Sequence, residues 1–292
     1  YRKLILFSFP LLFTGIFLRI MAWADTFFIG VFSSTYDVGI YNVAFPLAAS
    51  MGMFLVAFGQ IYYPLSAELL AKRKLAEIAK TFEVIIRWTF VMSFPLFLLA
   101  VLFPKYIIKF LFGNDYMAGS VALAILVSAY FLNVITGPGI HTLKSFKKLK
   151  FIFYLNIVVV IINIALNIIL IPKYGIEGAA VATAVSIVLR ELCIFFKVRR
   201  IIKFSYNLKY YLKYVLSGLM SLGIIYLLLI NFFRPYSLVE LLSAFILFAV
   251  LYCVFLLMLR SLSRDDIMVM LAIEKKLGLD LRFIKGILRR FV

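Results

Sequence analysis

The stretch NIALNIILIPKYGIEGAAVATAVS, Asn163 to Ser186, places a turn between two apolar helices. Its centre, Pro172-Lys-Tyr-Gly175, has residues that interrupt helices, and apolar residues continue on both sides. After the turn, Gly178, Ala182 and Ser186 recur every four residues, and such small residues let helices pack closely in a membrane. The stretch therefore predicts two membrane-spanning helices that are joined by a short connection.

The composition of the whole chain is typical of a membrane protein. Of its 292 residues, 65% are hydrophobic and only 15% are charged, whereas a soluble domain is about half apolar and about a quarter charged. A helix spans a bilayer with roughly 20 mostly apolar residues, and no segment alternates in polarity as the strands of a membrane barrel do. We therefore predict an all-α integral membrane protein. The length of a span gives about eight expected spans. They are Leu4–Phe32, Gly39–Ser66, Val84–Phe103, Ser120–Ile140, Phe151–Ile171, Gly178–Phe196, Tyr211–Phe232 and Leu238–Leu259.

The basic residues gather in alternate connections between these spans. The net charge is +18, and lysines and arginines concentrate at 72–80, 144–150 and 197–209 and near both chain ends. Because basic connections stay on the cytoplasmic side of a membrane, we expect both ends of this chain to be cytoplasmic. The positive charge then faces anionic lipid, and we expect no nucleic-acid partner.

No catalytic or metal site can be identified from the residue pattern. Cys193 and Cys253 lie in apolar runs, and His141 stands beside a basic connection without a metal-ligand partner. The sequence shows no carboxylate pair placed for acid–base catalysis, no glycine-rich phosphate loop and no nucleophile constellation. We therefore predict a protein that is not an enzyme and has no cofactor, with any coupling ion left open.

Two charged residues interrupt the first span. Arg19 lies fifteen residues past Leu4, which at about 1.5 Å per residue is near the middle of the membrane, where a charge costs at least ~2.5–3.5 kcal/mol on insertion scales. We expect Arg19 to face a wet cavity. Asp25 follows six residues later, about 600° around the helix, and therefore points to a different side. For Asp25, neutralisation by a neighbouring helix and a place in the cavity are both open.

Three asparagines share one face of the fifth span. Asn156, Asn163 and Asn167 are seven and four residues apart, which keeps them on the same side of a helix. Hydrogen bonding between helices is the usual role of such a face. Asn163 and Asn167 join Arg19 and Asp25 as candidate residues of a substrate cavity.

Several motifs, taken in order, resemble one transporter family. They are WADTFFIG at Trp23–Gly30, VGIYNVAFPL at Val38–Leu47, LFGNDYMAG at Leu111–Gly119, and the stretch Asn163–Ser186. The sequence is similar to Wzx-like polysaccharide flippases of the multidrug/oligosaccharidyl-lipid/polysaccharide exporter superfamily. The resemblance implies two six-helix lobes around a central cavity, often followed by two added helices.

The resemblance also implies how this chain is organised. It would supply the second lobe at 1–197, two additional helices with a basic linker at 198–260, and a cytoplasmic amphipathic tail at 261–292. The chain opens at Tyr1 rather than at a methionine, so we expect a missing N-terminal lobe to be its partner.

The function that the resemblance implies is the flipping of a polyprenyl-linked oligosaccharide across the plasma membrane for surface polysaccharide or glycan biosynthesis. The partners are then this substrate and the membrane lipids, and Arg19 would bind the anionic headgroup through charge-assisted hydrogen bonds. A drug or cation antiporter of the same superfamily is one alternative, although it would favour acidic groups in the membrane over an arginine. A membrane-embedded glycan-processing enzyme is another, but it would need large outer loops with acidic or histidine residues.

The charge pattern generates a prediction about topology. Cysteines placed at Lys74, Lys147 and Arg200 should not react with an impermeant thiol reagent added outside intact cells, because the basic connections are expected in the cytoplasm. Efficient labelling at any of the three positions would contradict the predicted orientation.

Overall fold

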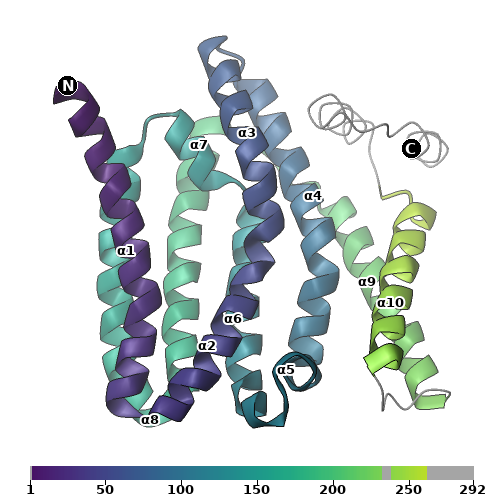
Figure 1. Cartoon of the computed structure of the whole chain (residues 1–292). Coiled ribbons are helices and arrows are strands. Elements are labelled where there is room, and N and C mark those ends of the chain that lie inside the picture. The colour runs from purple at the N-terminus through teal and green to yellow at the C-terminus, as the bar shows by residue number, and fades with distance from the viewer. Residues whose placement is uncertain (1, 232–237, 262–292) are drawn as a thin grey trace. The chain divides into compact units, whose positions relative to one another are not determined.

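The computed structural model describes residues 2–231 and 238–261, and within them it contains helices and no strands (Figure 1). The all-α prediction is confirmed. The chain divides into two compact units, Tyr1–Phe204 and Ser205–Val292. The predicted tail lies outside the described residues apart from Ser261. The elements of the first unit are α1 (Arg2–Phe32), α2 (Thr35–Ala49), η1 (Ser50–Gly52), α3 (Met53–Ala71), α4 (Leu75–Leu102), α5 (Pro104–Phe112), η2 (Asn114–Gly119), α6 (Ser120–Thr136), α7 (Gly139–Ser145) and α8 (Leu149–Ile202).

The second unit contains α9 (Leu208–Asn231) and α10 (Leu238–Met258). The Tyr214 hydroxyl on α9 donates to the Ser261 carbonyl at 3.3 Å and joins α9 to the chain that follows α10. Among the described residues of the whole chain, six helical segments are long and apolar enough to cross a membrane, and α10 adds a shorter apolar stretch at Ser243–Met258. The segment Leu149–Ile202 holds two of the predicted spans, and each other segment holds one, so all eight are accounted for. The protein is a multi-pass membrane protein.

Helix α8 holds two of the predicted spans. It has 54 residues, or about 80 Å if it were straight, which far exceeds the bilayer core of about 30 Å. Gly175 interrupts it with φ 55° and ψ −132°, a left-handed backbone that glycine adopts readily. Asn163 and Thr183, twenty residues apart, are joined by a hydrogen bond of 3.2 Å. The helix therefore folds back on itself at the turn seen at the lower end of the molecule in Figure 1.

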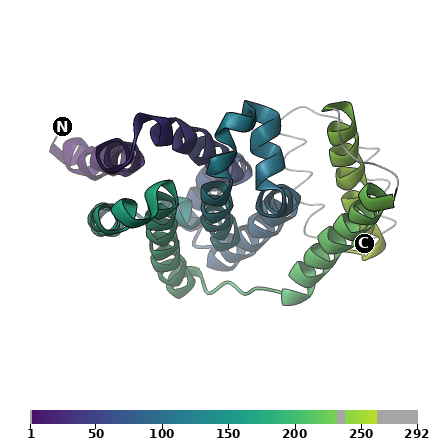
Figure 2. The same cartoon turned by 90° about the horizontal axis from the view of Figure 1, so that it is seen from below.

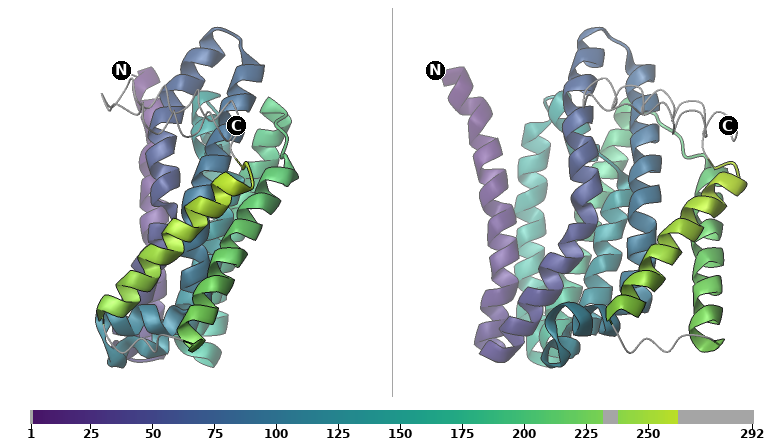
Figure 3. Two further views of the ribbon diagram at one scale, coloured as in Figure 1. Left: turned by 90° about the vertical axis from the view of Figure 1, so that its right-hand side faces the viewer. Right: turned by 45° about the vertical axis from the view of Figure 1, so that its right-hand side comes forward.

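The two ends of the first unit differ in the connections that they hold. The α1–α2 connection, α5 and the α8 turn lie at the lower end in Figure 1, and the N-terminus, the α3–α4 turn and α7 lie at the upper end. The basic stretches at 72–80 and 144–150 belong to the upper end. At the lower end α5 lies across the spans rather than along them (Figures 2 and 3). The charge asymmetry of the sequence thus follows the two ends of this bundle.

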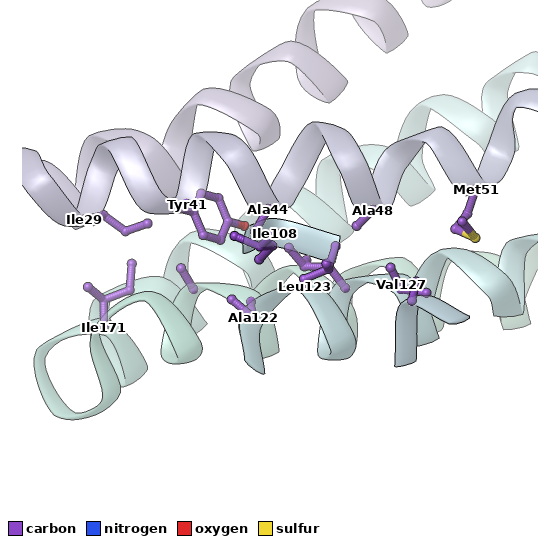
Figure 4. Close-up of a cluster of buried hydrophobic side chains, with 14 residues drawn as sticks. Ile29, Tyr41, Ala44, Ala48, Met51, Ile108, Ala122, Leu123, Val127 and Ile171 are labelled. Carbon is purple, nitrogen blue, oxygen red and sulfur yellow. The ribbon is translucent and has the colours of Figure 1, made fainter. Parts of the chain in front are cut away.

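The core of the first unit forms where α1, α2, α6 and α8 meet (Figure 4). Ile29, Tyr41, Leu123 and Ile171 are at most 1% exposed there. Small side chains from three helices complete the cluster and let the backbones approach closely: Ala44, Ala48, Ala122, Ala179 and Ala180. The Tyr41 ring packs in this core, which leaves its hydroxyl as a polar group in an apolar setting.

His141 has a packing role on α7. A Cβ atom on Gly59 of α3 would lie 2.4 Å from the His141 Nε2 atom, so the imidazole covers the bare glycine backbone. Burial lowers the pKa of His141, and the charge of Lys144 lowers it further, so the ring is neutral at pH 7. The described residues contain no group of three histidine, cysteine or acidic side chains that could hold a metal ion.

The close packing inside α8 generates a prediction. A Cβ atom on Gly178 would lie 2.5 Å from the Leu170 carbonyl oxygen, a backbone atom that cannot turn aside. Gly178→Ala should therefore cost about 1–3 kcal/mol by overpacking and lower the melting temperature of the full-length protein. Gly39→Ala is the matched control, because a Cβ atom on Gly39 meets no atom within 4 Å. An unchanged melting temperature in Gly178→Ala would contradict the close approach of the two spans.

Candidate functional site

The Asp25 carboxylate is the centre of a polar cluster inside the bundle. Asp25 lies on α1 and is 0% exposed. Its neighbours come from α2 and from both halves of α8: Tyr41, Asn163, Asn167 and Thr183. One acidic side chain therefore contacts elements that are far apart in the sequence.

Each oxygen of the carboxylate accepts hydrogen bonds. At Oδ1, the Asn167 amide donates at 2.7 Å and the Asn163 amide at 3.4 Å. At Oδ2, the Tyr41 hydroxyl donates at 2.7 Å, and the Thr183 hydroxyl is the second donor. A buried charge is costly unless hydrogen bonds or ion pairs satisfy it. These four neutral donors satisfy Asp25 without a basic partner among them.

Local geometry explains why these donors converge. Asn163 and Asn167 are four residues apart on one face of α8, and the Asn167 amide also donates to the Asn163 carbonyl at 3.3 Å. Thr183 lies beyond the Gly175 turn, and the folded-back helix returns it to the level of Asn163. Tyr41 follows Asp25 across the short α1–α2 connection. The two helix reversals thus supply the geometry of the cluster.

The cluster has the chemistry of a site for a proton or a monovalent cation. Its oxygens are one carboxylate, two amide carbonyls and two hydroxyls, a hard donor set with a single negative charge. The Asn167 Oδ1 atom is buried and accepts no hydrogen bond from any described residue. An unsatisfied buried acceptor is unfavourable, and a bound cation or a rearranged proton would satisfy it.

Arg19 is placed apart from this cluster. It is exposed on α1, six residues before the buried Asp25, and the two side chains point to different sides of the helix. Arg19 lines an open recess of about 600 Å³ together with Gly15, Ile16, Ile20 and Trp23. Trp23 is 68% exposed. Of the four residues that the sequence suggested for the cavity, Asp25, Asn163 and Asn167 come together, and Arg19 stands on the exposed surface.

Arg190 and Glu191 form an ion pair that was not predicted from the sequence. The Arg190 guanidinium donates to Glu191 Oε1 at 2.6 and 3.0 Å, and the Thr136 hydroxyl donates to Oε2 at 3.3 Å. Glu191 is 3% exposed. Both charges lie in the predicted span Gly178–Phe196. Two adjacent charges in an apolar run are the signal from which this pair could have been predicted.

Comparison with known sequences gives family matches. Residues 10–169 match the family described as MatE. The chain is 29% identical over 168 residues to the "Probable low-salt glycan biosynthesis flippase Agl15" of Haloferax volcanii, a match that covers 56% of this chain and 35% of that protein. It is 28% identical over 174 residues to the "Probable flippase AglR" of the same organism, covering 59% and 36%.

A more distant relative is the "Putative O-antigen transporter" of Shigella flexneri, 19% identical over 193 residues, with 66% of this chain and 46% of that protein covered. The chain thus spans less than half the length of these curated relatives. Among solved structures, a multidrug resistance MATE family transporter in an outward-facing conformation is similar with a TM-score of 0.51 and 16% identity. The match covers 89% of this chain and 64% of that one and concerns the fold.

The cluster generates a prediction about stability. Thr183→Val keeps the side-chain shape but removes a donor to Asp25 and the acceptor of the Asn163 amide. It should cost about 1–3 kcal/mol and lower the melting temperature of the full-length protein. Thr26→Val is the control on α1, because Thr26 donates to Asn42 at 3.1 Å in an exposed pair. Equal melting temperatures in the two variants would contradict a buried, hydrogen-bonded Asp25.

Proposed function

Because this chain belongs to the MatE family, we propose that it is part of a flippase that moves a polyprenyl-linked oligosaccharide across the plasma membrane for surface glycan biosynthesis. Two relatives from Haloferax volcanii carry flippase names, and they support a glycan-linked lipid as the cargo. The relatives are longer than this chain, so the complete transporter would include a partner lobe that precedes Tyr1. We propose a transporter rather than an enzyme.

One observation carries the proposal: an exposed arginine within a membrane-spanning helix stands six residues from a buried carboxylate cluster. An arginine facing hydrocarbon is costly, so Arg19 should face water, protein or a charged ligand. A lipid-linked oligosaccharide carries a pyrophosphate, and guanidinium groups bind phosphate oxygens through charge-assisted hydrogen bonds. The recess beside Arg19 is otherwise lined by Gly15, Ile16, Ile20 and Trp23. The indole ring of Trp23 suits contact with a sugar or a lipid chain.

Asp25 supplies a place where transport could be coupled to an ion. Loading the carboxylate with a proton or a monovalent cation would change the hydrogen bonds that hold α1 to α2 and α8. A ligand shifts an equilibrium between two conformations only if it binds them unequally. The closed ring of donors around Asp25 gives one such conformation, and a state with the cluster opened would be the other.

The alternatives receive less support from the same residues. A drug or cation antiporter would favour an acidic group beside its cationic cargo, whereas the charged residue that lines the recess is Arg19. A glycan-processing enzyme would need large outer loops with acidic or histidine side chains, whereas the connections at the lower end of the first unit are the short α1–α2 connection, α5 with η2, and the α8 turn. The basic connections at one end of the bundle support cytoplasmic chain ends.

The test of this proposal measures surface glycan in a strain that lacks its own flippase and receives the full-length protein. Arg19→Ala should lose most of the glycan, because one lost charge-assisted hydrogen bond costs about 1.5–3 kcal/mol, which is tenfold or more in affinity. Arg19→Lys should retain part of it, because the charge remains. Glycan is normalised to the amount of folded protein.

Lys173→Ala is the control, because it removes an exposed positive charge at the α8 turn rather than on α1. It should leave glycan levels unchanged. Asp25→Asn, in the same assay and normalised to folded protein, should lose transport. The amide keeps the shape and removes the charge, its oxygen can still accept from Asn163 and Asn167, and the Tyr41 and Thr183 hydroxyls can turn to accept from its N–H groups. Wild-type glycan with Arg19→Ala would contradict a cargo-binding arginine, and wild-type glycan with Asp25→Asn would contradict coupling through the carboxylate.

A further inference from the structure

Helix α5 is a short helix set between two spans. It runs from Pro104 to Phe112, and its nine residues measure about 13 Å. Phe103, with φ −125° and ψ 40°, breaks the backbone after α4, and Gly113, with φ 97°, ends α5. Both junctions turn the chain, so that α5 lies across the spans at the lower end of the first unit (Figures 1 and 2).

One side of α5 is anchored to the bundle. Ile108 is 0% exposed and belongs to the core cluster with Ala122 and Leu123 of α6. Ile107 packs against the same cluster. A helix fixed in this way has a defined rotation, so its remaining side chains face outward in a fixed arrangement.

The outward side of α5 combines positive charge with apolar surface. Lys105 and Lys109 are exposed and one turn apart. Tyr106 is 58% exposed, Leu111 50% and Phe112 43%. Water favours the lysines but not the apolar groups, and hydrocarbon favours the apolar groups but not the lysines. The headgroup region of a bilayer suits both.

The aromatic side chains around α5 also favour a position in the headgroup region. The Phe103 and Tyr106 rings are 6.3 Å apart, and so are the Phe112 and Tyr116 rings. Tyr36 is 62% exposed, and its hydroxyl donates to the Asp115 carbonyl at 2.8 Å. Tyrosine and other amphipathic aromatic groups concentrate at the membrane–water interface.

We propose that α5 is an interfacial helix whose Lys105 and Lys109 bind the anionic headgroups of the leaflet at this end of the bundle. The partner is the lipid surface, selected by the charge of the two lysines and by the apolar side chains beside them. Since Ile108 ties α5 to the core, the contact between α5 and lipid fixes the depth at which α4 ends and α6 begins. The proposal does not depend on the transported cargo.

The experiment uses the full-length protein in lipid nanodiscs with a fluorophore on Tyr106→Cys and all other cysteines, including Cys193 and Cys253, replaced by serine. A nitroxide near the lipid headgroup should quench the fluorophore more strongly than a nitroxide deep in the acyl chain, and more strongly than aqueous iodide. Leu75→Cys at the opposite end, an exposed position at the start of α4, is the control that iodide should reach. Strongest quenching of the Tyr106→Cys label by iodide, or by the deep nitroxide, would overturn the proposal. So would quenching by none of the three, which would mean that protein covers α5.

A second measurement tests the lysines. A headgroup nitroxide on phosphatidylglycerol should quench the Tyr106→Cys label at least roughly twice as strongly as the same nitroxide on phosphatidylcholine, because each lysine attracts anionic lipid. Lys105→Gln/Lys109→Gln should remove this difference and leave quenching by phosphatidylcholine unchanged. Lys147→Gln/Lys148→Gln, at the opposite end of the bundle, is the matched control and should preserve it. A difference that survives Lys105→Gln/Lys109→Gln would overturn the role of the lysines.

Discussion

The burial of the Asp25 carboxylate is the constraint on which the arrangement of the first unit depends. A charge at 0% exposure is tolerated only when hydrogen bonds replace the water that it has lost. Its donors lie on α2 and on both halves of α8. All of them reach the carboxylate only if the helices have one relative depth and rotation. Shifting any one of them along its axis by a residue would remove a donor, so this side chain specifies the register of the bundle.

The small residues of the core make this register accessible. Lipid is as apolar as the side chains that it touches, so helices in a membrane associate through close packing and polar contacts rather than through the hydrophobic effect. Gly178 lies against the Leu170 backbone, and this contact brings Thr183 within reach of Asn163 and Asp25. The alanines of α2 and α6 play the same part beside Tyr41. Close packing and the polar cluster thus support each other.

Much of the fold was predictable from the sequence, and the candidate site was predictable only in part. Long apolar runs located the spans, and helical geometry placed Asn163 and Asn167 on one face and sent Arg19 and Asp25 to different sides. Periodicity within one helix does not say which residue of another helix lies at the same depth, so Tyr41 and Thr183 were missed as partners. The short connections contain that information, because positions equally far from a tight reversal meet across it. Arg190 and Glu191 were not predicted because the mean hydropathy of their span remains high despite the two charges.

A single helix links the two features that the proposed function requires. Six residues of α1, about 9 Å of a rigid rod, separate the buried Asp25 from the exposed Arg19. The backbone between the two residues is continuous helix, so a movement of α1 at one residue would reach the other. In the proposed mechanism, a change in the hydrogen bonds of Asp25 would move or rotate α1, and Arg19 would move with it. Linkage is reciprocal, so an anion bound at Arg19 in one position of α1 would in turn alter the affinity of Asp25 for its proton or cation. The proposed coupling between ion and cargo therefore needs no chain of intermediate residues, because one helix carries both groups.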